Sequence, residues 1–335
     1  MTKTGDIPTA YPHIGVFGAG AWGTALAVTA AKAGRTVTLW GRDVARPEAM
    51  KSTREKKSFL SGGALPANLE LTGERAKVER ADAILAVVPT QSLREVLTGF
   101  ATSPQCPIVL CMKGIERGSG KLVTEVLREA LPNAEPALLS GPSFARDVVQ
   151  GLPTAVTIAA RTPIAQRLQA SLGHATFRPY ASEDMIGVAL GGAAKNVYAI
   201  ACGIVIGLGL GESARAALLA RSFSELCQLG RALGARHETL MGLSGLGDLM
   251  LTATSSTSRN FSFGLALGRG RPIRDLLAPG APLVEGVETA PALVARARSA
   301  GVDLPVAATV VDVLAGGMTP GAAVPWLMGR PYKKE

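Results

Sequence analysis

Two lysines stand in surroundings where a charged side chain is unusual. Lys113 follows the apolar run 108–112 and precedes a glycine, and Lys195 lies inside the small, apolar segment 191–197. A lysine withdrawn from water must be paired or functional, and burial lowers its pKa toward neutrality. Such an amine can protonate a developing alkoxide and accept the proton in the reverse reaction. Lys195 is therefore the candidate base, and the alternatives are a structural ion pair or a side chain that reaches the surface.

Three glycines near the N-terminus have the spacing G-x-G-x-x-G. They are Gly18, Gly20 and Gly23, and they stand between the apolar run 13–17 and the helix-like run 24–33. In a strand–turn–helix unit these glycines make the tight turn, admit a pyrophosphate and let the helix pack on the strand. The segment therefore predicts a dinucleotide site, and a purely structural glycine turn is the alternative.

The end of the second predicted strand bears on the choice of cofactor. The sequence there is Trp40-Gly41-Arg42-Asp43. An arginine at this place accommodates the 2′-phosphate of NADP, whereas an acidic residue binds the ribose hydroxyls of NAD. Arg42 comes first, so the sequence favours NADP, with NAD as the alternative because Asp43 is adjacent.

Two polar clusters suit a small phosphorylated substrate. Gly242–Asp248 ends in a carboxylate, and Ser255–Asn260 combines hydroxyls, an amide and the guanidinium of Arg259. The second cluster is suited to hold a phosphate. A polar loop that caps a helix explains it equally well.

The elements that must position these residues fall into two kinds. Short apolar strands are expected at 13–17, 36–40, 83–88, 108–112 and 137–140, with edge strands at 156–160 and 176–178, and helices between several of them. This alternation predicts an α/β, Rossmann-like, doubly wound parallel sheet. Only helical patterns follow, at 191–210, 214–233, 262–267, 288–300 and 305–314. We expect a dinucleotide-binding domain over 1–190 and an all-α substrate-binding domain over 191–335.

Composition narrows the function classes. The chain has 335 residues and a net charge of +9, but its lysines and arginines are dispersed, which favours a solvated surface over a nucleic-acid site. Four cysteines without C-x-x-C spacing and three scattered histidines predict no disulfide scaffold and no metal site. The polar N-terminus lacks a secretory pattern. The run Val197–Leu210 is too short for a membrane span and contains glycines, so we expect a buried core helix and no stable membrane insertion.

Taken together, the motifs resemble the bacterial type of the NAD(P)-dependent glycerol-3-phosphate dehydrogenase family from residue 14 to about 330. The segments that carry the resemblance are the glycine turn 18–27, Met112-Lys113-Gly114, 140–145, 151–155, 191–197, 245–249, Ser258-Arg259-Asn260 and Val284-Glu285-Gly286. Their order and spacing along the whole chain make coincidence implausible.

The resemblance implies a role for each matching residue. Lys195 would be the proton acceptor, and Lys113 would be shared by substrate and cofactor. The other substrate contacts would be Gly141, Ser143, Asp248, Ser258, Arg259 and Asn260. The other cofactor contacts would be Gly18, Gly20, Ala21, Trp22, Gly23, Arg42, Ala145, Arg259, Leu283 and Glu285. The resemblance further implies a cytoplasmic homodimer that interconverts sn-glycerol 3-phosphate and dihydroxyacetone phosphate for phospholipid synthesis.

The sequence departs from the family pattern in three places. Ala21 removes a hydroxyl from the glycine turn, Leu283 stands where valine is usual, and the segment 58–63 lacks a proline after Phe59-Leu60.

Two other interpretations of the function remain open. One is a Rossmann dehydrogenase acting on 6-phosphogluconate, hydroxyacyl-CoA or ketopantoate, and the other is a sensor that binds NAD(P) without turnover.

Overall fold

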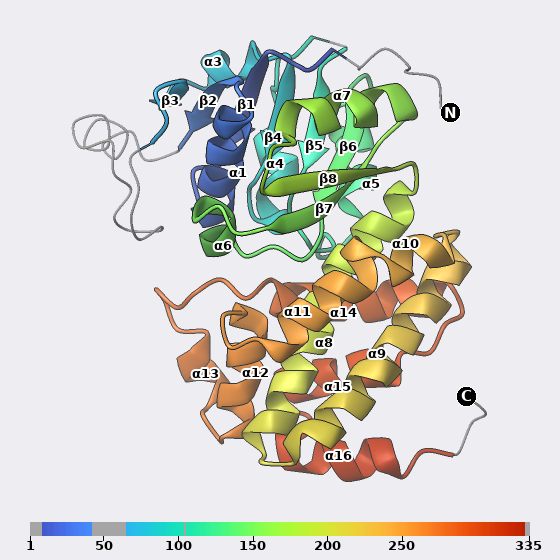
Figure 1. Ribbon diagram of the computed structural model, residues 1–335. Coiled ribbons are helices and arrows are strands. Elements are labelled where there is room, and N and C mark those ends of the chain that lie inside the picture. The colour runs from blue at the N-terminus through green and yellow to red at the C-terminus, as the bar shows by residue number, and fades with distance from the viewer. Residues whose placement is uncertain (1–8, 42–64, 104, 332–335) are drawn as a thin grey trace, which may run out of the picture. The chain divides into compact units, whose positions relative to one another are not determined.

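The structure, a computed structural model, describes residues 9–41, 65–103 and 105–331. The chain forms two compact units. The first comprises residues up to Met112 together with Val123–Val188, and the second comprises Lys113–Leu122 together with the chain from Ala189 onward (Figure 1). The boundary therefore falls inside a helix, and a ten-residue segment that includes Lys113 belongs to the helical unit.

The first unit is built on one eight-stranded sheet with the order β3-β2-β1-β4-β5-β6-β7-β8. Its strands are β1 (His13–Phe17), β2 (Thr36–Trp40), β3 (Leu69–Thr72), β4 (Ala83–Ala86), β5 (Pro107–Leu110), β6 (Glu135–Ser140), β7 (Thr154–Ala159) and β8 (Phe177–Ser182). All neighbouring strands are parallel except β6 and β7. The Rossmann-like fold class expected from the sequence is thus confirmed.

Two details of the sheet differ from the sequence-based expectation. Strand β3 was not expected, because it has only four residues and Glu70 interrupts its apolar pattern. The pairing of β6 with β7 is antiparallel. Neither detail changes the position of the glycine turn. The turn follows β1, and β1 lies between β2 and β4 in the sheet. That is the point where the strand order reverses, and doubly wound sheets bind their ligands there.

Helices cover both faces of this sheet. They are α1 (Ala21–Lys32), α3 (Arg75–Glu79), the 3-10 turn η1 (Thr90–Ser92), α4 (Leu93–Leu97), α5 (Val123–Ala130), α6 (Ala145–Val149) and α7 (Thr162–Leu172). Helices α1, α6 and α7 lie on one face, and α4 and α5 lie on the other (Figure 1). The core between α1 and the sheet consists mainly of alanine, valine, leucine and isoleucine. Small alanines let α1 approach the strands closely.

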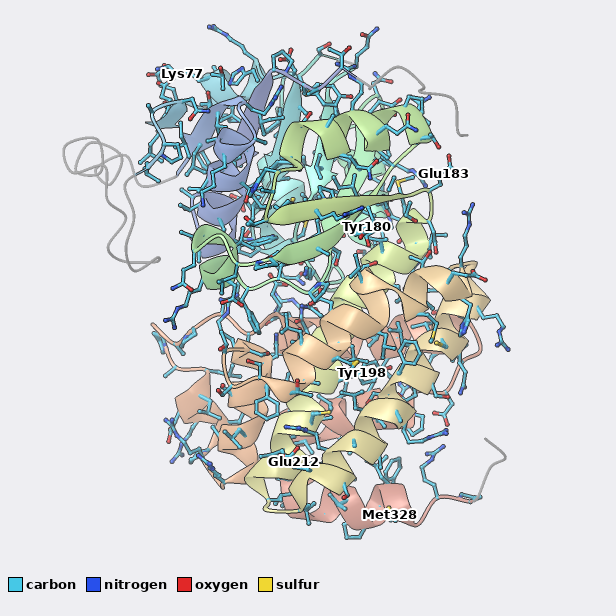
Figure 2. The ribbon with its side chains drawn as sticks, viewed as in Figure 1. Lys77, Tyr180, Glu183, Tyr198, Glu212 and Met328 are labelled. Atoms are coloured by element: carbon cyan, nitrogen blue, oxygen red, sulfur yellow. The ribbon has the colours of Figure 1, made fainter. Side chains whose placement is uncertain are left out.

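The second unit is helical. Its elements are α8 (Met185–Gly207), which begins in the first unit, α9 (Gly211–Leu233), α10 (His237–Met241), a π-helical turn (η2, Leu243–Gly247), α11 (Asp248–Thr254), α12 (Arg259–Gly268), α13 (Ile273–Leu276), α14 (Glu285–Ser299), α15 (Pro305–Leu314) and α16 (Pro320–Met328). Tyr198 lies inside this unit, whereas Met328 at the end of α16 is 78% exposed (Figure 2).

Glycines let α8 pack against α12 at backbone distance. A Cβ atom on Gly203 would lie 2.1 Å from the carbonyl oxygen of Phe261, and one on Gly264 would lie 2.0 Å from that of Ile200. Gly207 and Gly268 make similar approaches one turn further on, where a Cβ on either would lie 2.4 Å from a carbonyl oxygen of the other helix. The glycines of α8 are therefore packing positions, as the sequence suggested for a buried core helix.

Helix α8 is longer than the apolar run identified in the sequence. Its 23 residues satisfy, by length and composition alone, the requirement for a membrane span. Within the protein, however, 94% of its most apolar window is buried. The helix is thus accounted for as the core of the second unit.

Candidate functional site

The glycine turn after β1 has the geometry that its sequence predicts. Gly18 has a φ of +122°, and a Cβ there would lie 2.2 Å from the carbonyl oxygen of Val87 beyond β4. A Cβ on Gly23 would lie 1.8 Å from the carbonyl oxygen of Gly18. Both positions therefore exclude any side chain, because Gly18 lies against the backbone of Val87 and Gly23 lies against the backbone of Gly18.

Gly20 differs from the other two glycines because, among the described residues other than its chain neighbours, no atom lies within 4 Å of the position its Cβ would take. It is the N-cap of α1, and no side chain in the described part of the chain caps that helix end. The uncapped amides and the open space above Gly20 suit an anionic group such as a pyrophosphate. The indole Nε1 of Trp22 is buried and has no hydrogen-bond partner among the described residues. The residues of this turn thus fit a dinucleotide.

Three other predicted residues lie in the first unit. Gly141 follows β6 with a φ of +148°, and its carbonyl oxygen accepts a hydrogen bond from the hydroxyl of Ser143 at 3.1 Å. Ala145 begins α6 and, like Trp22, packs against the core beneath α1. Arg42, the residue on which the predicted cofactor preference depends, lies outside the described residues, as does the whole segment 58–63 that lacks the family's proline.

In the second unit, one carboxylate joins the two candidate lysines. The Nζ of Lys195 donates to Oδ1 of Asp248 at 2.5 Å, and the Nζ of Lys113 donates to Oδ2 at 2.6 Å. Lys195 also donates to the hydroxyl of Thr252 at 2.9 Å. The lysines come from α8 and from the segment before α5, and Asp248 and Thr252 lie one turn apart on α11. These four residues are called the lysine–aspartate cluster below.

Burial sets the protonation behaviour of this cluster. The side chains of Asp248, Lys195 and Lys113 are 1%, 10% and 15% exposed. Desolvation lowers the pKa of Lys195 to about 8, against the opposing attraction of Asp248 and with the help of the nearby Lys113 charge. Burial alone would raise the pKa of Asp248, but the two ammonium groups hold it below its usual value. The cluster thus keeps an anionic carboxylate beside an amine that can exchange a proton near neutral pH.

Two asparagines connect the cluster to other segments. The side-chain amide of Asn196 donates to the carbonyl oxygen of Lys113 at 2.8 Å. Asn260 donates to the side-chain oxygen of Asn196 at 2.9 Å and accepts from the backbone amide of Gly286, also at 2.9 Å. The chain of hydrogen bonds fixes the backbone of Lys113 relative to α8, α12 and the start of α14. Asn260, predicted as a substrate contact, has both ends of its side chain engaged in this chain.

The remaining predicted residues occupy two helix starts. The hydroxyl of Ser258 accepts from the amide of Phe261 and caps α12, so the capping role considered from the sequence is present. Arg259 follows it, is exposed, and forms no ion pair with any residue in the described part of the chain. Glu285 begins α14, and Leu283 just before it is 45% exposed.

Sequence reasoning missed three members of this arrangement. Thr252 stands four residues after Asp248, which is the spacing that places two side chains on one helix face, so the helical pattern could have found it. Asn196 belongs to the segment 191–197, and its sequence context alone assigns it no hydrogen-bond partner. Gly286 contributes through its backbone amide. Backbone contacts of that kind leave no signal in a single sequence.

Two family models match nearly the whole chain. Residues 13–165 match the NAD-dependent glycerol-3-phosphate dehydrogenase N-terminus, and residues 184–325 match the C-terminus of the same family. Both candidate lysines and the glycine turn lie inside the matched residues.

Individual proteins show the same likeness. A glycerol-3-phosphate dehydrogenase [NAD(P)+] of Bradyrhizobium sp. (strain BTAi1) is 54% identical over 330 residues, which cover 98% of this chain and 99% of the relative. One from Rhodospirillum rubrum is 51% identical over 327 residues, 96% and 94% of the two chains. The crystal structure of glycerol-3-phosphate dehydrogenase from Coxiella burnetii matches with a TM-score of 0.90 and 36% identity, covering 96% of this chain and 99% of that one. The chain belongs to the NAD-dependent glycerol-3-phosphate dehydrogenase family.

Proposed function

We propose that this protein interconverts sn-glycerol 3-phosphate and dihydroxyacetone phosphate with NAD or NADP as cofactor. The observation that carries the proposal is the lysine–aspartate cluster, in which the Nζ of Lys195 lies 2.5 Å from a buried carboxylate. A carbonyl that is reduced needs a proton at its oxygen, and the reverse reaction needs a base for the hydroxyl. An amine whose pKa is about 8 can perform both tasks near neutral pH.

Each residue of the cluster has a proposed task. In the direction of reduction, the Lys195 ammonium donates its proton to the oxygen of the former carbonyl, and in oxidation the neutral amine takes it back. Asp248 orients that amine, and its negative charge favours the protonated form of Lys195. Lys113, on the other oxygen of Asp248, provides a second positive charge for the negative oxygen of the substrate.

The cofactor supplies the hydride when it is bound. The amides at the start of α1 and the open space at Gly20 support its binding through the pyrophosphate. We further propose Ala21, Trp22, Ala145, Leu283 and Glu285 as cofactor contacts, with Arg42 as the determinant of a preference for NADP. The ratio of kcat/KM for NADPH to that for NADH, in the wild type and in Arg42→Ala, tests that preference.

A phosphate on the substrate requires a cation or a set of donors. Arg259 is exposed at the start of α12 and has no ion-pair partner in the described chain, so it is the proposed phosphate ligand. Gly141, Ser143, Ser258 and Asn260 are proposed to complete the substrate contacts. An Arg259→Ala variant should raise KM for dihydroxyacetone phosphate about 10-fold or more, since a charge-assisted contact contributes roughly 1.5–3 kcal/mol.

Family membership supports three further proposals: a homodimer, a cytoplasmic location, and a role in supplying glycerol 3-phosphate for phospholipid synthesis. Light scattering of the purified protein tests the first, and cell fractionation tests the second. Depletion of the protein, followed by measurement of phospholipid synthesis with and without added glycerol 3-phosphate, tests the third.

The decisive experiment follows NADPH or NADH absorbance after addition of dihydroxyacetone phosphate, with unphosphorylated dihydroxyacetone as the control substrate. Lys195→Met should reduce kcat by about 100-fold or more while the Kd for NADPH stays within about 3-fold, because general acid–base catalysis contributes on the order of 10²–10⁴. Lys77→Met is the matched control, since Lys77 is a partly exposed lysine that pairs with Glu70 on the first unit (Figure 2). Equal losses of turnover and cofactor binding in Lys195→Met would contradict the proposed role.

A further inference from the structure

A second buried carboxylate lies in the helical unit, apart from the lysine–aspartate cluster. Glu225 stands in the middle of α9, and the residue is only 4% exposed. No lysine, arginine or histidine within the described ranges forms an ion pair with it. A buried carboxylate without a cation is costly, so its retention at this place calls for an explanation.

Glu225 finds its partners at the start of another helix. Its Oε1 accepts from the backbone amide of Val306 at 2.7 Å, and its Oε2 accepts from that of Ala307 at 3.3 Å. These amides belong to the first turn of α15, whose own N-cap residue, Leu304, provides no side-chain hydrogen bond. Glu225 therefore caps α15 from a different helix, and two donors that would otherwise remain unsatisfied are paired.

The same carboxylate also contacts the helix of the candidate base. The hydroxyl of Tyr198 donates to Oε2 of Glu225 at 3.3 Å. Tyr198 is fully buried on α8, three residues after Lys195. Residues three apart on a helix are neighbours, so a contact that holds Tyr198 also holds the turn that presents Lys195 and Asn196.

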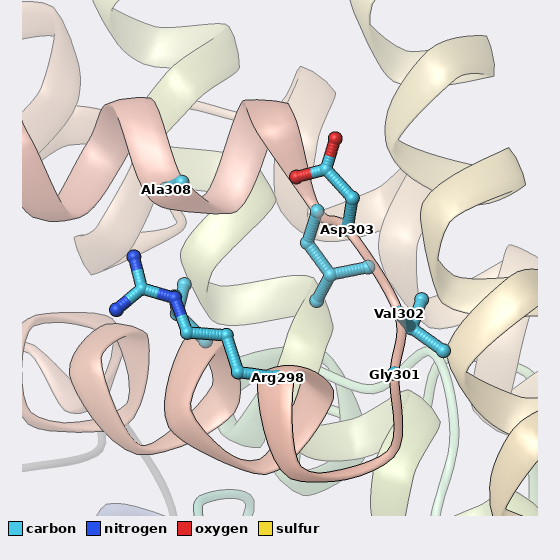
Figure 3. Close-up of a pocket in the computed structure, with 7 residues that line it drawn as sticks. Arg298, Gly301, Val302, Asp303 and Ala308 are labelled. Carbon is cyan, nitrogen blue, oxygen red and sulfur yellow. The ribbon is translucent and has the colours of Figure 1, made fainter.

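Asp303 is a charged residue that acts on Glu225. Asp303 precedes α15 and pairs with Arg330 at 2.6 Å. It lines, with Arg298, a pocket of about 290 Å³ beside the same turn (Figure 3). Burial raises the pKa of Glu225 to about 7, while the hydrogen bonds from Val306, Ala307 and Tyr198 oppose that rise and the Asp303 charge adds to it. A glutamine at this position has the shape of glutamate without its negative charge, so it resembles the protonated form of Glu225.

We propose that Glu225 is a positioning residue for the reaction. Its carboxylate joins α9 and the first turn of α15 to Tyr198, and it thereby holds the turn of α8 that presents Lys195. The inference rests on the proposed function of Lys195. A purely local role, in which Glu225 only caps α15, is the competing explanation. The two differ in what happens when the contact with Tyr198 is removed and the contacts with α15 are kept.

Tyr198→Phe makes that separation, because it deletes one hydroxyl and leaves the amides of Val306 and Ala307 bonded to Glu225. We expect kcat to fall about 3- to 10-fold, the loss of about one hydrogen bond, with little change in the KM for cofactor. Glu225→Gln should have the same effect or a larger one. Thr319→Ala is the matched control, since the hydroxyl of Thr319 caps α16 by accepting from the amide of Ala322 and takes no part in the hydrogen bonds described above for Glu225, Tyr198 and the lysine–aspartate cluster.

A readout independent of turnover completes the test. The rate at which an amine-reactive ester labels Lys195, measured by peptide mass spectrometry against pH and normalised to Lys77, reports the titration of the amine. The pH at the midpoint of this labelling curve should change in Tyr198→Phe and in Glu225→Gln and should stay the same in Thr319→Ala. An unchanged kcat and midpoint in both variants would overturn the proposal and leave Glu225 as a cap. Absence of wild-type turnover with dihydroxyacetone phosphate would instead contradict the proposed function, and the labelling would still decide the role of Glu225.

Discussion

The Nζ of Lys195 and the Oδ1 of Asp248 are 2.5 Å apart, and neither side chain exposes more than a tenth of its surface. The other oxygen of the carboxylate bonds Lys113, so one buried anion faces two cations. When all three groups are ionised, this arrangement carries a net positive charge. Burial is the main cause that lowers the pKa of Lys195, the Lys113 charge adds to it, and the attraction of Asp248 opposes both.

Removal of that anion should change the titration of Lys195 in a defined direction. In Asp248→Asn the burial remains and the attraction is lost, so the pKa of Lys195 falls further below about 8. We expect kcat to fall about 100-fold or more, because the amine also loses its orientation, and the midpoint of the pH profile to move to lower pH. Asp275→Asn, an exposed aspartate of α13, serves as the control. A midpoint that rises or stays would contradict the assignment of Lys195.

The pH dependence of the wild type should differ between the two directions of the reaction. Oxidation of glycerol 3-phosphate requires the neutral amine of Lys195, so its rate should rise with pH and level off above about 8. Reduction of dihydroxyacetone phosphate requires the ammonium, so its rate should be greatest below that pH and decline above it. Initial rates from pH 6 to pH 10 in both directions check this opposition, and parallel profiles would refute it.

Two glycines of the first turn should respond differently to alanine. Gly20 has an ordinary extended conformation with φ of −69° and open space around its Cβ position, so Gly20→Ala should leave the melting temperature nearly unchanged. It should weaken NADPH binding about 10-fold or more if the pyrophosphate approaches there. Gly23→Ala should instead lower the melting temperature, because its Cβ would overlap the carbonyl oxygen of Gly18. Tight NADPH binding by Gly20→Ala would place the pyrophosphate elsewhere.

The packing of α8 on α12 should be equally sensitive to one methyl group. Gly264→Ala places a Cβ 2.0 Å from the carbonyl oxygen of Ile200, which forces the helices apart. We expect a loss of about 1–3 kcal/mol in the free energy of unfolding, typical of an overpacked core. Gly321→Ala lies in α16, where no atom of the described residues beyond the adjacent helix backbone is within 4 Å of the new Cβ, so it should be neutral or slightly stabilising. Denaturant titration of both variants makes the comparison, and equal stabilities would show that α8 and α12 can separate without cost.

Local patterns were sufficient to identify much of the fold. The strands of the parallel sheet that precede β7, apart from β3, are continuous apolar runs bounded by turn residues, and buried parallel strands have that pattern. The antiparallel direction of β7 relative to β6 was not predictable in this way, because a short apolar strand has the same composition whether it runs parallel or antiparallel to its neighbour. Strand β3 is too short, and too polar at Glu70, to stand out from a loop.

By itself, the sequence determined the glycine turn, the succession of strands and helices, and the unusual status of Lys113 and Lys195. These follow from local chemistry, because a glycine that must accept a close backbone, or a charge in an apolar segment, is visible along the chain.

Only the tertiary structure decided that Lys113 belongs with the helical unit, that one carboxylate joins both lysines, and that Asn196, Asn260 and Gly286 hold the backbone between them. It also decided that Glu225 caps a helix that begins 80 residues later in the chain, at Pro305, while it bonds Tyr198. The physical reason is that these interactions join residues separated by tens to more than a hundred positions. Their strength depends on burial and on distances of a few ångströms, which packing alone sets.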